Sequence, residues 1–332
     1  MAHTRESQGL PKLDAPERIT FPSRKTTFPL FANEFGDGWL QLINLTLRCG
    51  TVKGTSEAER LAEVLNAVVT IELAAREEAL PPFFDFTTDD LEAFHRRFTS
   101  TSDPRGADYS YAERLRSWPR SGGEAHGSEA TNQLESAIER LKRSHDTRSG
   151  TVVLLGPTDL DGLDDAPCVV SVTFNIVDER LYGTYVLRSE DVHNAWPLDA
   201  LSLARLQREA AERIGLPVAS ATFIMHSAHI HERDWDRAWK TLNRWFERPL
   251  PLQTDPSGLF LFGLDEGRAR AMLITHEADA VLWEGEFNSP EELSWYIVDV
   301  MPWLSAQHVR YIGQECASMT RALQEGEEYV QG

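Results

Sequence analysis

Cys168 stands in a setting where a thiolate nucleophile could form. It follows Pro167 and opens the run CVVSVTFNIV, whose β-branched and aromatic residues predict a strand. The next predicted strand ends at Arg188, a cation that could favour ionisation of the thiol. The alternative is an inert, buried cysteine, which is common at such positions. Covalent catalysis by Cys168 is therefore one chemistry open to this chain.

Two carboxylates stand on faces that the apolar pattern predicts to be buried. The stretch from Ser56 to Leu80 has helical spacing, which puts Glu72 on the same face as the apolar positions. Asp199 is the third residue of a helix predicted to begin at Pro197, and it shares a face with apolar residues of that helix. A buried carboxylate is costly unless it is paired, hydrogen-bonded or protonated, and such groups are frequent at catalytic sites. The non-catalytic alternatives are a structural ion pair for Glu72 and a partner of the helix dipole for Asp199.

Three histidines lie on one predicted strand, VASATFIMHSAHIH. Its period of two puts His229 and His231 on one face and His226 on the other. Two histidines could bind zinc, but no third ligand with a recognisable spacing accompanies them. We therefore predict no metal site.

The composition narrows the class of protein. The chain has 332 residues with 33 Lys+Arg against 52 Asp+Glu, a formal net charge of −19, and 41% of it is hydrophobic. These values predict a folded, acidic protein and argue against nucleic acid as a partner. Cys49, Cys168 and Cys316 are odd in number and lack CxxC spacing, which argues against a disulfide framework. No apolar run reaches the roughly 20 residues of a membrane span and no apolar signal core follows Met1, so we expect a cytoplasmic protein without a membrane partner.

The elements that must position these residues follow from periodicity and turn signals. Residues 1–27 are predicted to be a flexible arm, and 119–132 a loop. With no internal repeat and no convincing linker, we expect a single α+β domain over 28–332. The elements predicted within it are a helix to about Ser144, strands at TVVLLG, CVVSVTFNIV and RLYGTYVLR, a helix from Pro197 to about Ile214, the strand of the histidines, a helix at DWDRAWKTLNRWFER and, after Pro251, strand pieces followed by helices.

The order and spacing of these residues resemble thymidylate synthase and its relatives, the cytidylate hydroxymethylases. That family has its nucleophilic cysteine in a Pro-Cys dipeptide that opens a strand, and twenty residues later an Arg-Ser-x-Asp turn that binds phosphate and base. Here these are Pro167-Cys168 and Arg188-Ser189-Glu190-Asp191. The family's Tyr-Gly-x-x-Trp-Arg-x-Trp resembles the stretch from Tyr111 to Trp118, and its helix with a catalytic Glu-Leu resembles the stretch ending in Glu72-Leu73.

Two further positions extend the resemblance, which covers roughly residues 40–240. Arg148 stands twenty residues before the cysteine, where the family has an arginine that reaches the phosphate site of the partner subunit. The family's ribose-binding strand, Asp-x-His-hydrophobic-Tyr, looks like Ser227-Ala228-His229-Ile230-His231.

The resemblance implies a thymidylate synthase-like α+β fold, with a mixed β-sheet packed by helices and a homodimer formed through the sheet. It implies that Cys168 adds to C6 of a pyrimidine nucleotide, and that C5 then attacks the one-carbon unit of the co-substrate 5,10-methylenetetrahydrofolate. Glu72 would be the general acid and base, with Tyr111 as its hydrogen-bonding partner. The positions that match the family's substrate contacts are Arg148, Arg188, Ser189, Asp191, Asp199, His229 and His231.

One position separates the members of this family. Eleven residues after Arg188, thymidylate synthase has Asn and the cytidylate enzymes have Asp, and this chain has Asp199. Uracil offers a ring N–H donor and a carbonyl acceptor, whereas cytosine offers a ring nitrogen acceptor and an amino donor. We therefore expect a CMP or dCMP 5-hydroxymethylase in which water completes the reaction. A dUMP-methylating thymidylate synthase and an inactive nucleotide-binding dimer are the alternatives.

Departures from the family pattern concern the phosphate, the sugar and the folate. No Gly-rich, Arg-containing phosphate loop is recognisable near Gly50-Thr51, the tyrosine of the ribose strand is His231, and the part from about 250 diverges from the family. No Trp occurs between Leu73 and Ser117, where thymidylate synthase has tryptophans near the hydride-transfer region. This absence favours water over hydride as the final acceptor.

Overall fold

The computed structural model describes residues 27–54, 59–74, 79–101, 109–118, 130–161, 166–246, 258–275, 278–301, 304 and 306–332. The chain divides into two compact units, one of residues 10–247 and one of residues 1–9 with 248–332. We call them the N-terminal unit and the C-terminal unit, and each is described by itself. The arm expected at 1–27, except for its last residue, and most of the loop expected at 119–132 lie outside the described residues.

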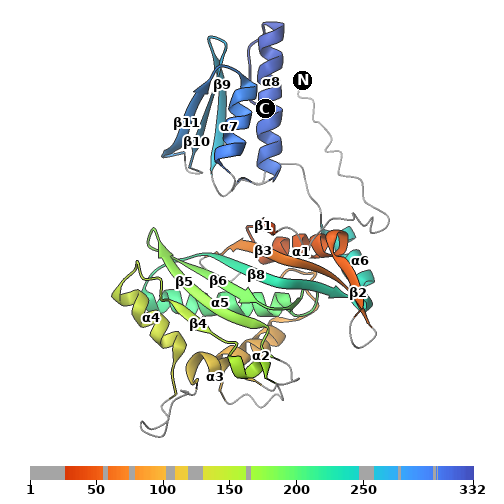
Figure 1. Ribbon diagram of the computed structural model, residues 1–332, viewed down its shortest axis with the longest axis vertical. Helices are drawn as coiled ribbons and strands as arrows, with labels where there is room; N and C mark the ends of the chain where they lie inside the picture. The colour runs from red at the N-terminus through yellow and green to blue at the C-terminus, as the bar shows by residue number, and fades with distance from the viewer. Residues whose placement is uncertain are drawn as a thin grey trace. The chain divides into compact units, whose positions relative to one another are not determined.

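A mixed β-sheet forms the centre of the N-terminal unit (Figure 1). Its strands in the described part of the chain are β1 (Phe28–Ala32), β2 (Thr51–Gly54), β3 (Arg60–Glu72), β4 (Thr151–Val153), β5 (Val169–Val177), β6 (Arg180–Leu187), β7 (Glu190–Asp191) and β8 (Val218–His231). They follow the order β1-β3-β8-β6-β5-β4, with β2 beside β3 and β7 beside β8. β1 is parallel to β3 and β6 to β8, whereas β3–β8, β5–β6 and β4–β5 are antiparallel. The expected mixed sheet is confirmed.

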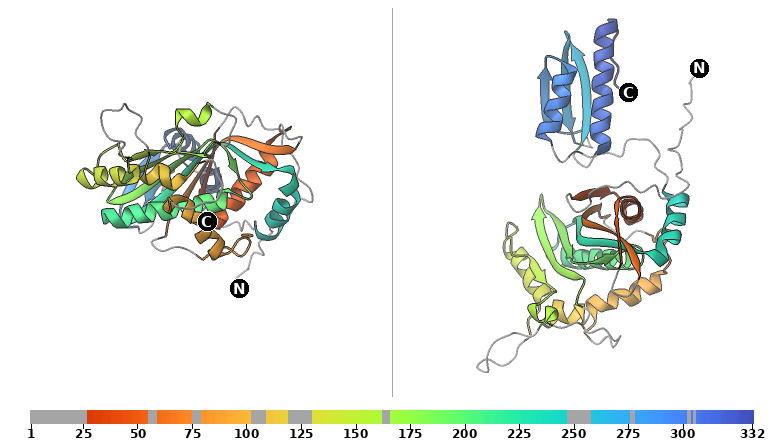
Figure 2. Two further views of the ribbon diagram at one scale, coloured as in Figure 1. Left: turned by 90° about the horizontal axis from the view of Figure 1, so that it is seen from below. Right: turned by 45° about the vertical axis from the view of Figure 1, so that its right-hand side comes forward.

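A layer of helices covers one face of this sheet (Figure 2, left). The helices are α1 (Phe35–Cys49), α2 (Thr88–Thr99), α3 (Tyr111–Arg116), α4 (Gln133–Arg143), α5 (Trp196–Ile214) and α6 (Trp235–Trp245), with the short 3-10 turns η2 (Pro157–Leu160) and η3 (Glu232–Asp234). Along β6, alternate side chains are fully buried and those between them are half-buried. The sheet is therefore closed on the helical face and more open on the other. The helix from Pro197, the histidine strand and the helix after it are confirmed as α5, β8 and α6.

β3 corrects one sequence-based prediction. The stretch from Ser56 to Leu80 was expected to be a helix, but Arg60–Glu72 is a strand paired with β8 along its length. The residues Leu61–Val64 are buried on both faces, so the apolar positions do not alternate and their spacing resembled that of a helix. The β-branched run from Val68 to Ile71 favours the strand.

The β5–β6 hairpin brings Cys168 next to Arg188. Its turn residues, Asp178 and Glu179, have φ values of 49° and 53°, the left-handed pair that a two-residue hairpin turn requires. The register then pairs Val169 with Leu187, across a bulge at the open end. As a result the backbone N–H of Arg188 donates to the carbonyl oxygen of Cys168 at 2.8 Å.

A buried glutamine fixes α5 on the sheet. The side-chain amide of Gln207 donates to the carbonyl oxygens of Leu181 at 2.8 Å and Ser220 at 3.1 Å, which lie on β6 and next to it on β8. Its Oε1 accepts from the hydroxyl of Tyr185 at 2.9 Å. Gly183 lies under this contact, where a side chain would not fit. The position of the first turn of α5 relative to the sheet depends on this anchor.

The C-terminal unit has its own sheet and core. Antiparallel strands β9 (Leu259–Asp265), β10 (Arg268–Ile274) and β11 (Val281–Phe287), in the order β11-β10-β9, pack against α7 (Pro290–Val300) and α8 (Ala306–Glu325). The expected strands and helices after Pro251 are confirmed. The expectation of one domain over 28–332 is corrected, because the apolar side chains of this unit form a core separate from that of the N-terminal unit.

Within the described ranges, no helix is both long enough and apolar enough to span a bilayer.

Replacing Gly183 with alanine should weaken the packing of α5 on the sheet. A Cβ at this position would lie less than 3.0 Å from Gln207 and from the Tyr185 hydroxyl. We expect Gly183→Ala to lower the free energy of unfolding by about 2 kcal/mol, as overpacking does. Urea unfolding measures the change. Gly54→Ala is the matched control, since no heavy atom lies within 4 Å of its added Cβ. Equal stability of the two variants would contradict the anchoring role.

Candidate active site

Arg188 holds the backbone that leads into Cys168. Its Nε donates to the carbonyl oxygen of Pro167 at 3.0 Å, and an Nη donates to the carbonyl oxygen of Ala166. Cys168 is half-buried and not in a disulfide. Cys168 and Arg188 are neighbours in the fold, and the guanidinium fixes the two residues before the cysteine.

Tyr111 contacts the same segment from α3. Its hydroxyl accepts a hydrogen bond from the backbone N–H of Val169 at 3.2 Å, and its ring stacks on Phe98 with centroids 4.7 Å apart. Burial, with a smaller contribution from Asp199, raises the pKa of Tyr111 well above its ordinary value. The phenol therefore stays protonated at neutral pH, and its proton is available to a group other than Val169.

Asp199 lies in the first turn of α5, where its predicted burial is confirmed. The residue is 6% exposed, and its Oδ1 has no hydrogen-bonding partner among the described residues. Burial raises the pKa of Asp199 to about 7, against a smaller lowering by the charge of Arg97. That guanidinium also lies over the ring of Tyr111, 5.7 Å from its centroid. Asp199 is thus a carboxyl that can exchange a proton near neutrality.

Glu190 is a second buried carboxyl that sequence reasoning did not single out. It is 1% exposed, and neither of its carboxyl oxygens has a partner among the described residues. Burial raises its pKa well above the ordinary value, and Asp199 and Asp191 raise it further. Its strand, β7, is only two residues long, so no periodicity could have marked the side chain as buried.

Glu72 is not part of this cluster. Its side chain is exposed at the end of β3, where it pairs with Ser220. The strand pairing leads across the sheet from Val169 through Leu187 and Met225 to Ala67 on β3. Glu72 is five residues further along, or about 17 Å, and three strands across. The prediction that Glu72 occupies a core face was wrong, because it rested on the helix, and the structure places it beside neither Cys168 nor Tyr111.

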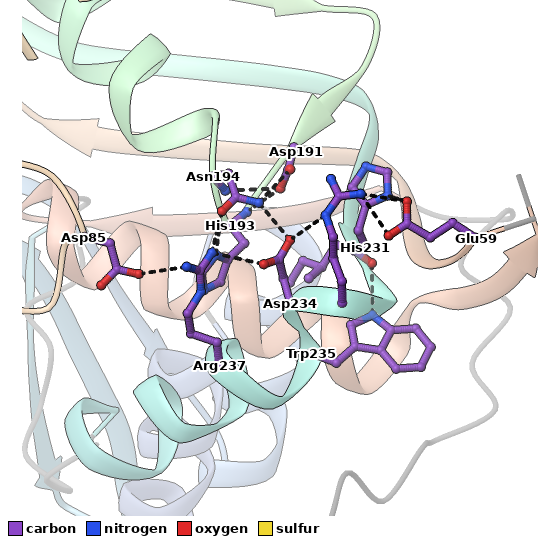
Figure 3. A network of polar contacts seen from close by, with 11 residues as sticks. Glu59, Asp85, Asp191, His193, Asn194, His231, Asp234, Trp235 and Arg237 are labelled. Carbon is purple, nitrogen blue, oxygen red and sulfur yellow. Dashed lines mark hydrogen bonds and ion pairs between the residues drawn. The ribbon is translucent and has the colours of Figure 1, made fainter. Parts of the chain in front are cut away.

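Asp191 organises the turn between β7 and α5 (Figure 3). Its Oδ1 accepts from the backbone N–H groups of His193 at 3.0 Å and Asn194 at 3.1 Å, and its Oδ2 accepts from the Asn194 amide at 2.9 Å. Asn194 also donates to Asp234 at 2.9 Å, and Arg237 donates to Asp234 at 3.0 Å. This network joins the turn to the start of α6. Asp191 therefore serves first to position its neighbours.

His229 and His231 lie on one face of β8, as predicted, with ring centroids 5.2 Å apart, and His226 is exposed. The Nδ1 of His231 lies 3.0 Å from a carboxylate oxygen of Glu59. Burial lowers the pKa of His229, so its imidazole is neutral at pH 7. It stands in a row with Asp191 and Glu63 on the adjacent strands. These histidines extend the polar surface from the turn across β8.

Ser189 and Arg148 complete the sequence-predicted set. Ser189 is half-buried beside Arg188. Arg148 is exposed in the connection from α4 to β4, near the β5 residues Thr173 and Phe174 rather than near Cys168. The structure therefore does not bring Arg148 to the cysteine of its own subunit. The described residues also contain no group of three His, Cys, Asp or Glu side chains that could hold a metal ion.

Comparison with known proteins agrees with this arrangement. A family model described as thymidylate synthase matches residues 70–262, which is more than half of the chain. A protein named "Putative thymidylate synthase" from Methanothermobacter thermautotrophicus is 30% identical over 232 residues, 66% of this chain and 99% of that protein. Proteins of the same name from Methanococcoides burtonii and Methanosarcina mazei are 27% and 28% identical over 64% and 62% of this chain, and over 93% and 90% of their own lengths.

The matched family consists of one-carbon transferases that act on a nucleotide. The chain belongs to the thymidylate synthase family. Enzymes of this family use 5,10-methylenetetrahydrofolate as the co-substrate. A second family model, described as PterinBD-DUF4346, matches residues 254–332, which include all described strands and helices of the C-terminal unit.

The raised pKa of Asp199 predicts a pH dependence of stability. The folded side chain keeps its proton up to about pH 7, whereas the unfolded one loses it near the ordinary value of 3.8. Between these values the unfolded state binds fewer protons, so the contribution of Asp199 to stability falls as pH rises. We expect the stability of Asp199→Asn relative to wild type, measured by urea unfolding, to increase from about pH 4 to about pH 7. A difference that stays constant over this range would contradict the assigned pKa.

Proposed function

We propose that this protein is a CMP or dCMP 5-hydroxymethylase. The observation that carries the proposal is Asp199, a buried carboxyl whose Oδ1 has no hydrogen-bonding partner among the described residues, at the position where a cytosine-specific relative has an acid. A carboxylate accepts a hydrogen bond from the exocyclic amino group of cytosine and repels the O4 carbonyl of uracil. Buried polar groups left unpaired disfavour the wrong base.

In the proposed reaction, the Cys168 thiolate adds to C6 of the pyrimidine, which makes C5 nucleophilic. C5 attacks the one-carbon unit of 5,10-methylenetetrahydrofolate, and loss of the C5 proton with elimination of tetrahydrofolate leaves an exocyclic methylene. Water then adds to give the hydroxymethyl group, and the cysteine leaves. Tyr111, which is protonated and hydrogen-bonds to the backbone next to Cys168, is the proposed proton relay. Glu72, exposed and distant, has no part in this scheme.

The phosphate and the sugar are assigned to the polar surface beside the cysteine. Arg188 presents a guanidinium, a group that suits an oxyanion, and Ser189 adds a hydroxyl next to it. Asp191 keeps the turn in place, while His229 and His231 face the sugar. Arg148 is proposed to reach the phosphate from the partner subunit, which fits its distance from its own Cys168.

A homodimer formed through the open face of the sheet is part of the proposal. That face has one row of threonines across five strands, in which two pairs of hydroxyls are 3.0 and 3.1 Å apart. The row consists of Thr70, Thr222, Thr184, Thr173 and Thr151. Its side chains are not covered by the helical layer, so they are available to a second copy of the chain.

The alternatives are methylation of dUMP and an inactive nucleotide-binding dimer. The protein is incubated with 5,10-methylenetetrahydrofolate and one of CMP, dCMP or dUMP, with an incubation without nucleotide as the control. Mass spectrometry of the nucleotides then separates the proposed function from these alternatives. We expect a cytosine nucleotide to gain the mass of CH2O, and Cys168→Ala to abolish this gain while nucleotide binding remains. Gain of CH2 on dUMP would establish methylation instead, and no product on any nucleotide would favour the inactive dimer.

We also propose that the C-terminal unit contributes to binding the co-substrate. The support is the similarity of residues 254–332 to a family whose name refers to pterin binding, because tetrahydrofolate contains a pterin ring. The unit has a core of its own and could form such a module.

Shortening the chain after Glu247 tests this role. We expect the KM for 5,10-methylenetetrahydrofolate to rise about tenfold, which corresponds to about 1.4 kcal/mol of lost binding. The Kd for the nucleotide should stay the same, since its proposed contacts lie in the N-terminal unit. Unchanged kinetics for the co-substrate would exclude a contribution of the C-terminal unit to its binding.

A further inference from the structure

We propose that Glu190 and Asp199 form a buried acid pair, in which Glu190 keeps the proton that N3 of cytosine takes up when Cys168 adds to C6. This inference rests on the proposed function, and it gives the site a proton donor that neither Asp199 alone nor Glu72 supplies.

Each of the two side chains has at least one carboxyl oxygen without a hydrogen-bonding partner among the described residues. A buried carboxyl that only stabilises the fold is normally hydrogen-bonded or paired with a cation. Glu190 has no partner for either oxygen, and Asp199 has none for Oδ1, within the described residues. Unsatisfied buried polar atoms of this kind mark places where a ligand or an ordered water completes the bonding.

The unsatisfied atoms are concentrated in one stretch of the chain. From β7 into the first two turns of α5, further buried side chains have a polar atom without a protein partner in the described structure. These atoms are His193 Nε2, Trp196 Nε1 and Ser202 Oγ. The same stretch follows Arg188 and includes the turn that Asp191 organises. The two acids therefore stand in the part of the site already assigned to the base.

The charges around the pair decide which acid holds the proton. Two buried carboxyls that repel each other do not both ionise near neutral pH. Asp199 has the positive charge of Arg97 beside it, which favours its ionised form. Among the described residues, the charged groups that act on Glu190 are acids, Asp199 and Asp191. Tyr111 is protonated, and Cys168 as a thiolate would add a further negative charge. Glu190 thus remains the neutral acid when Asp199 has lost its proton.

This distribution matches cytosine and not uracil. The Asp199 carboxylate accepts from the exocyclic amino group, and the protonated pair offers one donor to the N3 acceptor. Uracil would require the reverse arrangement, with an acceptor for its N3–H and a donor for O4. Where the environments of two acids separate their pKa values, one acid commonly serves as the proton donor and the other as the acceptor.

The proton and electron movements balance. A sulfur lone pair forms the S–C6 bond, the C5=C6 π electrons form C4=C5, and the C4=N3 π electrons move to N3. N3 takes the proton from the acid pair, which becomes doubly ionised for the lifetime of the adduct. When the cysteine leaves, the electrons return along the same path and N3 gives the proton back to the pair. No further co-reactant is needed.

The first test detects the proton itself and needs no turnover. Infrared spectra of the wild-type chain at pH 8 should contain the C=O stretch of a protonated carboxylic acid, which shifts on 13C labelling of glutamate and is lost in Glu190→Gln. Glutamine has nearly the same shape, and circular dichroism confirms that the variant is folded. Absence of a label-sensitive band in the wild-type chain would overturn the acid pair.

The second test uses the pH profile of kcat/KM for the cytosine nucleotide. In Glu190→Gln the only proton left is that of Asp199, with a pKa of about 7. The alkaline limb should therefore move down to about pH 7, with a loss of about tenfold at pH 8 and little loss at pH 6. Glu209→Gln, which removes a half-buried acid of the same helix that is paired with Arg116, should keep the wild-type profile. An equal loss at every pH would indicate a structural role only and would overturn the proposal.

The two tests separate this inference from the proposed function. A protonated glutamate at pH 8 in a protein that acts on dUMP alone would overturn hydroxymethylation of cytosine and the proton delivery to N3, and would leave the acid pair standing. Turnover of CMP or dCMP without the carboxyl band, or with an unshifted alkaline limb, would uphold the function and overturn the acid pair.

Discussion

The hydrogen bond between Arg188 and Cys168 is the contact on which the geometry of the candidate active site depends. It exists because a two-residue turn at Asp178-Glu179 fixes the register of β5 and β6, so that two residues twenty positions apart become neighbours at the open end of the hairpin. The guanidinium then donates hydrogen bonds to the carbonyl groups before the cysteine, and the Tyr111 hydroxyl accepts one from the amide after it. Cys168 is thus held on both sides by side chains from separate elements, an arrangement that limits its freedom before any ligand is bound.

A second constraint places the acids. α5 is tied to β6 and β8 through Gln207, and its first turn carries Asp199 toward the end of the sheet where β7 holds Glu190. Burial of these carboxyls is unfavourable for their charged forms, so it favours their protonated forms. The same burial that raises their pKa values also excludes water, which strengthens their interaction with any ligand.

Most elements around the cysteine could be predicted from the sequence, because their patterns are local. The hairpin, α5 with its proline start, and β8 have clear periods and turn signals, and the position of Asp199 on an apolar face correctly indicated its burial. The failure at β3 has a physical cause: a strand buried on both faces has no alternation, and pairing with β8 decided its structure. Glu72 was misplaced for that reason. Glu190 could not be found because its burial depends on tertiary packing around a two-residue strand, and the separate core of the C-terminal unit depends on contacts that no local pattern encodes.

The row of threonines on the open face of the sheet has a consequence for assembly. The hydroxyl groups of Thr70 and Thr222 form a hydrogen bond between neighbouring strands, so these polar atoms depend less on hydrogen bonds to water. The methyl groups of the same residues provide apolar area that another layer can cover. Such a face tolerates both water and a protein partner, so association on it would be a reversible equilibrium set by protein concentration rather than a precondition for folding.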